Sequence, residues 1–289
     1  MRNVPGHGKQ LSYYQFGSTS FFASAYDQRF SYCLYVPHSY SEDDDRRYQL
    51  VVAVHGTGRM VELSRELFAD FCERHDCIVL APLFPCGIDE PGELSNYKFI
   101  EYRGIRYDEI LLAMVDEISS IWRVSSDRFM LHGFSGGGHF THRFAYLHPE
   151  RLLAISVGSP GVVTLLDFGH PWWVGVADVE ERFGRSVDLD ALRRVAVHMV
   201  VGADDTATWE ITIREGDRLY QPGVHLQGDT RIDRIRSLAR SFEDHGIAVQ
   251  LDLVPGVSHE LVSLMPATRA FFRDVLAGAR PASISGSLG

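Results

Sequence analysis

Short runs of apolar residues alternate with helix-forming stretches along this chain, and this alternation limits the folds open to it. The clearest run, residues 49–54 (QLVVAV), is typical of a strand buried on both faces of a parallel sheet. Similar runs lie at residues 30–36, 78–83, 128–132, 152–157, 196–201 and 248–254, with helical patterns at 63–74, 108–122 and 137–147. The alternation predicts an α/β fold, with a mostly parallel central sheet flanked by helices on both faces.

Two long segments interrupt the alternation, at residues 162–194 and 207–230. Insertions at the carboxyl edge of a parallel sheet shape the ligand crevice, so we expect these two to act as a cap or lid. No linker rich in proline, glycine and serine divides the chain. We therefore predict a single domain over residues 1–279, followed by a flexible tail at 280–289.

Composition excludes several classes of protein. The 289 residues carry a formal net charge of −10, and the 28 basic residues are scattered, which argues against nucleic-acid binding. We find no apolar run of about 18 residues and no signal-peptide pattern, and so expect no membrane span and a cytoplasmic location. The cysteines form no CxxC pair, which favours reduced thiols. The sequence does not indicate how many subunits assemble.

The segment Gly133-Phe134-Ser135-Gly136-Gly137 lies between a predicted strand and a predicted helix. A Gly-x-Ser-x-Gly pattern in this position is typical of a nucleophile elbow, where a tight turn exposes the serine hydroxyl. Without a Gly-Lys-Ser/Thr sequence, a phosphate-binding loop is disfavoured. Ser135 is therefore the predicted nucleophile.

A serine nucleophile needs a base and an acid that orients the base, and in elbow enzymes they follow in the order acid, histidine. Asp205 follows the predicted strand 196–201, and His259 follows the predicted strand 248–254. We predict these two residues as the acid and the base, with the neighbouring Asp204 as the alternative acid. Two other histidines follow the acid, but His225 lies in an irregular segment and His245 lies where a helix C-terminus is expected.

An oxyanion hole needs two backbone amides. Gly136, directly after the nucleophile, is predicted to supply one. The turn His55-Gly56-Thr57-Gly58 after an earlier strand is predicted to supply the other, from Thr57 or alternatively Gly58. His55 is interpreted as a structural hydrogen-bonding residue of that turn.

Several other side chains are candidates for the site. His139 and His142 have a spacing that two metal ligands on one helix face could use, but no third ligand matches, so a packing role is favoured and no metal is expected. Large aromatic side chains could line the substrate pocket, with ordinary packing as the alternative reading. The aromatic candidates are Trp172, Trp173, Trp209 and Tyr97.

These motifs together resemble the α/β-hydrolase superfamily. Residues 32–37 followed by 54–56, and 133–137 followed by 148–150, are similar to bacterial esterases of the polyhydroxyalkanoate-depolymerase, feruloyl-esterase and dienelactone-hydrolase kind. The resemblance covers roughly residues 30–277. It implies a nucleophile, acid and base at Ser135, Asp205 and His259, and oxyanion amides at Thr57 and Gly136.

From these residues we expect a cofactor-free serine hydrolase that cleaves a small or medium carboxylic ester through an acyl-enzyme. An amide, lactone or thioester is the first alternative substrate, because the same groups serve each. Acyl transfer to another acceptor and a non-catalytic binding module are further alternatives.

Overall fold

A computed structural model of the chain describes residues 10–278, so the predicted tail at 280–289 lies outside the described residues. The chain divides into two compact units, residues 1–131 and residues 132–289. The prediction of a single domain remains a prediction.

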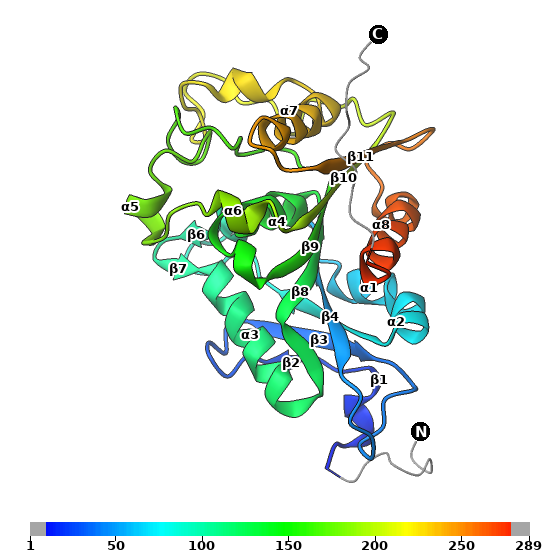
Figure 1. Ribbon diagram of the computed structural model, residues 1–289. Helices are drawn as coiled ribbons and strands as arrows, with labels where there is room; N and C mark the ends of the chain where they lie inside the picture. Colours follow the sequence, from blue (N-terminus) through cyan, green and yellow to red (C-terminus); the bar gives the residue numbers. More distant parts are fainter. Residues whose placement is uncertain (1–9, 279–289) are drawn as a thin grey trace. The chain divides into compact units, whose positions relative to one another are not determined.

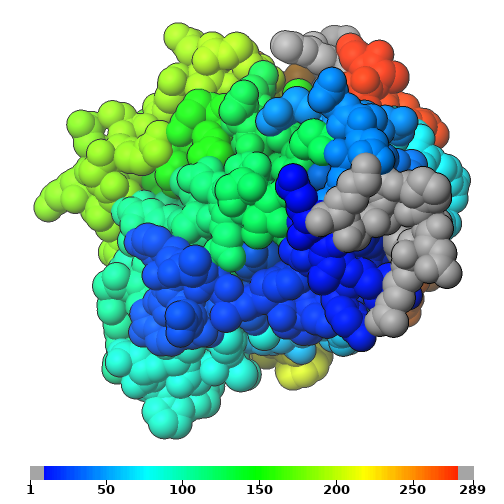
Figure 2. Space-filling view, turned by 90° about the horizontal axis from the view of Figure 1, so that it is seen from below, coloured from blue at the N-terminus to red at the C-terminus, as the bar shows by residue number. Residues whose placement is uncertain are grey.

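The strands of the first unit follow the order β1-β3-β5-β4-β8, and β2 also pairs with β3. β4 and β5 are parallel, with Gln49 opposite Cys77, whereas β3 runs antiparallel to β5. Residues 10–47, which precede β4, are coloured blue in Figure 2, where they form a continuous stretch of this unit's surface. The strands are β1 (Gly17–Ser18), β2 (Phe22–Ala23), β3 (Ser31–Val36), β4 (Tyr48–Val54), β5 (Cys77–Leu83) and the start of β8 (Val124–Phe134).

Helices cover both faces of this part of the sheet, with α1 and α2 on one side and α3 on the other (Figure 1). The predicted helical stretch at 63–74 consists of two helices, separated by a turn at residues 67–68. In the turn between the two helices, Phe68 N–H donates to Arg65 O, and the Phe68 ring is buried. The helical elements and the hairpin are η1 (Tyr13–Gln15), α1 (Val61–Glu66), α2 (Ala69–His75), η2 (Asn96–Phe99), β6 (Glu101–Tyr102), β7 (Ile105–Arg106) and α3 (Tyr107–Ile121).

β8 runs on into the second unit, where the strand order is β8-β9-β10-β11. β10 is parallel to both of its neighbours, with Ala196 opposite Ala154 and Val197 opposite Val249. Every residue of β10 is buried, which explains why its sequence is apolar except for His198. The strands are β9 (Leu152–Gly158), β10 (Ala196–Gly202) and β11 (Val249–Val254).

In the second unit, α4 and α8 lie on opposite faces of the strands (Figure 1). α7 lies on the α4 side, since the rings of Phe242 and Tyr146 are in contact. The first insertion (162–194) holds two short helices, and the second insertion (207–230) is irregular except for one 3-10 turn. The helical elements are α4 (Gly136–Leu147), η3 (Pro149–Arg151), α5 (Val179–Phe183), α6 (Leu189–Leu192), η4 (Val224–Gln227), α7 (Arg231–Glu243) and α8 (Leu261–Leu276).

The predicted fold class is confirmed: the chain is an α/β protein with a mostly parallel central sheet and helices on both faces. All four cysteines, Cys33, Cys72, Cys77 and Cys86, are free thiols. Within residues 10–278, every helix is too short or too polar to cross a membrane.

Candidate active site

Ser135 occupies a strained turn between β8 and α4. Its backbone angles are φ 54° and ψ −113°, a region that residues other than glycine seldom adopt. The turn is fixed on both sides, because Ser135 N–H donates to Gly158 O at 2.8 Å and Ser135 O accepts from His139 N–H at 3.1 Å. The local structure is therefore that of the predicted elbow.

Two glycines allow this turn to be so tight. A Cβ atom on Gly133 would lie 2.2 Å from Gly137 O, and a Cβ on Gly138 would lie 2.6 Å from Gly158 O. Both distances are far below van der Waals contact with backbone atoms that cannot easily move. The glycines of the motif are thus required by the close approach of α4 to β8 and β9.

Ser135, His259 and Asp205 lie together in a hydrogen-bonded chain within the second unit. His259 Nε2 is 3.1 Å from Ser135 Oγ, and His259 Nδ1 is 2.7 Å from Asp205 Oδ2. With Nδ1–H donating to the carboxylate, Nε2 is left to accept the serine proton. Asp205 is buried, whereas the alternative acid Asp204 is exposed.

The parallel pairing of β10 with β11 brings the loops of the acid and the histidine together. Ala203 N–H donates to Val254 O and Asp204 N–H donates to Val257 O, each at 2.9 Å. A Cβ on Gly202 would lie 2.2 Å from Val257 O and 2.3 Å from Ser258 O, so only glycine permits this approach. The position of the histidine therefore depends on a backbone contact made at the end of β10.

The Phe134 ring packs on the His259 imidazole, with centroids 4.7 Å apart and an interplanar angle of 32°. Phe134 directly precedes Ser135, so the same turn that presents the serine also supports the flat face of the histidine. This packing limits rotation of the imidazole while its two nitrogens stay in their hydrogen bonds.

Arg231 is a residue of this cluster that the sequence did not reveal. It is the first residue of α7, its side chain is 4% exposed, and its NH1 donates to Asp205 Oδ1 at 3.2 Å. Its NH1 also donates to Ala207 O, and its NH2 donates to Glu210 Oε2 at 2.9 Å. No local motif marks this arginine, because its partners come from a loop more than 20 residues earlier in the chain.

The two predicted oxyanion donors fall in different units. Gly136 is the first residue of α4, where backbone N–H groups have no acceptor within the helix and the helix dipole favours an anion. In the first unit, Thr57 O accepts a hydrogen bond from Arg59 NH1 at 2.6 Å. Gly58 has open space around it.

His55 supports the turn that contains Thr57. Its Nε2 accepts from Phe84 N–H at 3.0 Å, and its Nδ1 donates to Gly56 O at 2.8 Å. Burial lowers the pKa of His55 to about 3, so the ring stays neutral and both bonds persist. These contacts are those of a structural residue.

His139 and His142 hold the start of the first insertion onto α4. His139 Nε2 accepts from Gly161 N–H at 2.8 Å and from Val162 N–H at 3.0 Å. His142 Nε2 accepts from Thr164 N–H at 3.0 Å, while its Nδ1 donates to Gly138 O. Nitrogens committed to backbone amides are not available to a metal, and no group of three or more His, Cys, Asp and Glu in residues 10–278 is arranged to hold one.

Three of the four aromatic candidates are buried. Trp172 and Trp173 are each 5% exposed; Trp172 packs on Phe183, and Trp173 Nε1 donates to Leu219 O at 3.1 Å. Tyr97, in the first unit, donates its hydroxyl to His55 O. These contacts match the packing alternative. Trp209 differs, since it is 80% exposed on the loop that follows Asp205.

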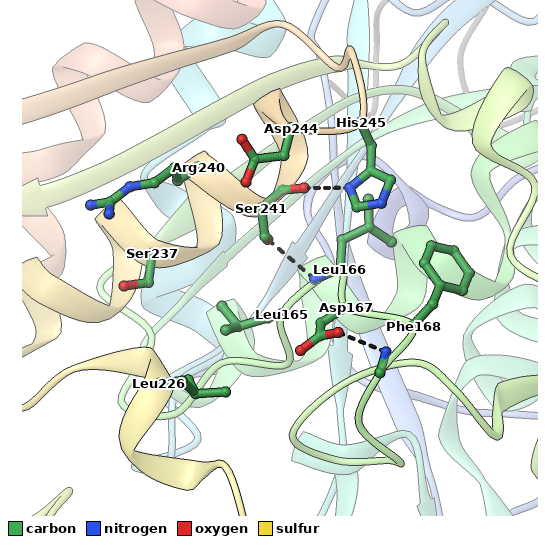
Figure 3. A pocket seen from close by; sticks show the side chains of 11 residues that line it. Leu165, Leu166, Asp167, Phe168, Leu226, Ser237, Arg240, Ser241, Asp244 and His245 are labelled. Carbon is green, nitrogen blue, oxygen red and sulfur yellow. Dashed lines mark hydrogen bonds between the residues drawn. The ribbon is translucent and has the colours of Figure 1, made fainter.

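A hollow of about 550 Å³ lies in the second unit between the first insertion, η4 and α7 (Figure 3). His245, one of the alternative histidines, lines it and donates from Nδ1 to Ser241 O at 2.8 Å, as a residue that caps a helix end does. His225, the other alternative, is exposed on η4. The cluster around Ser135 contributes no side chain to this hollow. Its lining is Leu165, Leu166, Asp167, Phe168, Gly169, Leu226, Ser237, Arg240, Ser241, Asp244 and His245.

Known structures resemble this chain along most of its length. Poly(aspartic acid) hydrolase-1 from Sphingomonas sp. KT-1 superimposes with a TM-score of 0.68 at 18% identity, covering 88% of this chain and 97% of that one. LpqC, a poly(3-hydroxybutyrate) depolymerase from Bordetella parapertussis, gives 0.64 at 23% identity, covering 88% of each chain. FphF, a fluorophosphonate-binding serine hydrolase from Staphylococcus aureus, gives 0.58 at 14% identity, covering 90% of this chain and 99% of that one.

The sequence matches no protein-family model and no curated protein. At these identities the structural likeness establishes the fold, which is that of the α/β-hydrolases. The resemblance inferred from the sequence is thereby confirmed at the level of the fold. What the chain does has to be argued from its own site.

Proposed function

We propose that this protein is a serine hydrolase that cleaves a small or medium carboxylic ester through an acyl-enzyme on Ser135. The observation that carries the proposal is the hydrogen-bonded chain Ser135 Oγ–His259 Nε2 and His259 Nδ1–Asp205 Oδ2, at 3.1 Å and 2.7 Å, on a strained elbow. The likeness to chains named as esterases and hydrolases supports the reaction class. It carries no information on the substrate.

In the proposed mechanism, His259 takes the Ser135 proton as Oγ attacks the acyl carbonyl carbon. The Gly136 amide at the start of α4 stabilises the resulting oxyanion. Thr57 is proposed as the second donor, with Gly58 as the alternative, and this part of the proposal rests on the sequence motif. The imidazolium, oriented by Asp205, then gives its proton to the departing alcohol. Water resolves the acyl-enzyme by the same route.

Two measurements on purified protein test this proposal. Replacing Ser135 with Ala is expected to lower the turnover of a p-nitrophenyl ester by about four to six orders of magnitude. A fluorophosphonate probe is expected to label wild type at Ser135, as mapped by peptide mass spectrometry. Absence of labelling in folded protein, or turnover retained by the Ser135→Ala variant, would overturn the assignment.

A panel of matched substrates separates an ester from the alternatives. The same acyl group offered as ester, thioester and amide keeps the acyl-enzyme constant and changes only the leaving group. A lactone is compared separately, because its leaving oxygen stays attached to the acyl group and the intermediate is a hydroxyacyl-enzyme. We expect the ester to give the highest kcat/KM. Added alcohol or amine acceptors distinguish hydrolysis from acyl transfer, since a transferase would form the new ester or amide.

A further inference from the structure

Arg231 is a buried charge that contacts the proposed catalytic acid directly. Its side chain is 4% exposed and that of Asp205 is 1% exposed, so their contact at 3.2 Å is shielded from water. A charge in such a place is costly unless it is paired and hydrogen-bonded. Arg231 meets this condition with two carboxylates, Asp205 and Glu210, and one carbonyl, Ala207 O.

The two oxygens of Asp205 have different partners. Oδ2 accepts from His259 Nδ1, and Oδ1 accepts from Arg231 NH1. A carboxylate held at only one oxygen can rotate about its Cβ–Cγ bond and present the other oxygen. Held at both, it has one orientation, in which the shorter bond of 2.7 Å points at the histidine.

The start of α7 fixes the arginine in turn. Thr230 Oγ1 accepts from Asp233 N–H at 3.1 Å, and Asp233 Oδ2 accepts from Thr230 N–H at 3.0 Å, which forms a capping box. Arg231 is the residue directly after this cap. Its backbone is therefore anchored before the side chain reaches the acid.

The net charge of Arg231, Asp205 and Glu210 favours a protonated His259. Arg231 carries one positive charge between the carboxylates of Asp205 and Glu210, so the three side chains together carry one negative charge. His259 becomes positive during the proposed reaction and so faces a net negative group. Without Glu210, which is 51% exposed, the arginine would neutralise Asp205.

We propose that Arg231 is a positioning residue that locks the Asp205 carboxylate toward His259 while Glu210 offsets its charge. This inference rests on the proposed function, because it concerns the acid of the same relay. Arg231 acts through Asp205, so its loss is expected to change kcat while KM stays constant.

The test compares Arg231→Gln, Arg231→Lys and Glu210→Gln with wild type, using a p-nitrophenyl ester. We expect Arg231→Gln to lower kcat by about 10- to 100-fold, with KM within about twofold. The lysine variant keeps the charge but not the planar fork, and is expected to recover part of the loss and remain several-fold below wild type. Glu210→Gln keeps the contact to Asp205 and is expected to lower kcat by only about two- to threefold.

A second readout does not depend on turnover. Proton NMR detects the low-field signal of the Asp205–His259 hydrogen bond, which we expect to be present in wild type and Glu210→Gln and weakened or lost in Arg231→Gln. An unchanged signal in Arg231→Gln would overturn the inference. So would a kcat of Arg231→Gln within about twofold of wild type, because the Asp205 carboxylate would then need no second partner.

Circular dichroism and thermal unfolding establish that each variant is folded. If Arg231→Gln does not fold, the lysine variant is compared with wild type, and unchanged kcat and signal would overturn the inference. The proposed function fails by a different result, namely the absence of fluorophosphonate labelling in wild type. The NMR comparison would still decide the role of Arg231 in that case.

Discussion

Gly202 offers the sharpest test of how the fold positions the histidine. Adding a Cβ by Gly202→Ala would place it 2.2 Å from Val257 O and 2.3 Å from Ser258 O, where contacts under 3.0 Å essentially never occur. The two backbones must therefore separate by about 0.8 Å. His259 is the next residue in the displaced loop.

The expected effect on the site follows from that displacement. If His259 moves by the same amount, the Nε2–Oγ distance of 3.1 Å grows toward about 4 Å and the contact no longer transfers a proton well. A misplacement of about 1 Å costs on the order of 100-fold in rate, so we expect kcat/KM to fall by about 100-fold. Overpacking of this kind lowers the free energy of unfolding by about 1–3 kcal/mol, which leaves room for a folded protein.

Gly256→Ala is the matched control in the same loop. Gly256 has a φ of 70° and no atom within 4 Å of an added Cβ, so alanine there strains the backbone without displacing its neighbours. We expect the control to lower stability by about 1 kcal/mol and kcat/KM by less than about threefold. Steady-state kinetics and urea unfolding measure both variants. A folded Gly202→Ala protein with kcat/KM near the control would refute the reasoning.

Three further predictions concern stability and binding. Ser135→Gly is expected to be about 1 kcal/mol more stable to urea than Ser135→Ala, because both lack the hydroxyl and only glycine relieves the strained φ of 54°; equal midpoints would contradict this. Burial lowers the pKa of His132 to about 3, so the unfolded chain takes up a proton first and stability is lost as pH falls from about 6.5 toward 3. Urea unfolding at several pH values should show that this group lowers the free energy of unfolding by on the order of 1 kcal/mol for each pH unit in that range. If the free energy of unfolding of a His132→Gln variant depends on pH as steeply as that of wild type, the prediction is refuted. Trp209→Ala should leave the unfolding temperature unchanged because the side chain is 80% exposed, and should raise KM for a medium-chain p-nitrophenyl ester several-fold, since Trp209 is proposed to line the substrate pocket; an unchanged KM would contradict that role.

The sequence predicted those parts of the molecule that are encoded locally. The strand before Ser135 and the helix after it were expected from a short motif, and the structure has them within a few residues. Asp205 and His259 were expected from their places after two strands, and the parallel pairing of those strands brings them within hydrogen-bond distance. Each expectation used a local pattern of strand, turn and helix together with the order of these residues along the chain.

Features that depend on distant contacts were not predicted. Arg231 resembles any other arginine at a helix start until the loop that carries Asp205 and Glu210 is folded against it. The break between α1 and α2 follows from burial of Phe68, which the helical periodicity does not reveal. For Trp172 the sequence left pocket lining and packing both open, because its contact with Phe183, eleven positions later in the same insertion, has no local signature.

The anchoring of the first insertion has a consequence for how this protein can vary. His139 and His142, on the helix that begins directly after Ser135, bind main-chain amides of Gly161, Val162 and Thr164. Bonds of this kind do not depend on the identity of the residue that donates them, except that proline has no N–H to give. The path of the insertion is therefore set by its main chain, but few sequences fit that path. A Cβ on Gly161 would lie 2.8 Å from Ile211 Cγ2, and the buried Thr164 donates its hydroxyl to Trp173 O at 2.6 Å. The start of the insertion is thus a poor place to graft or randomise a loop, because changes there would reach the helix that follows Ser135.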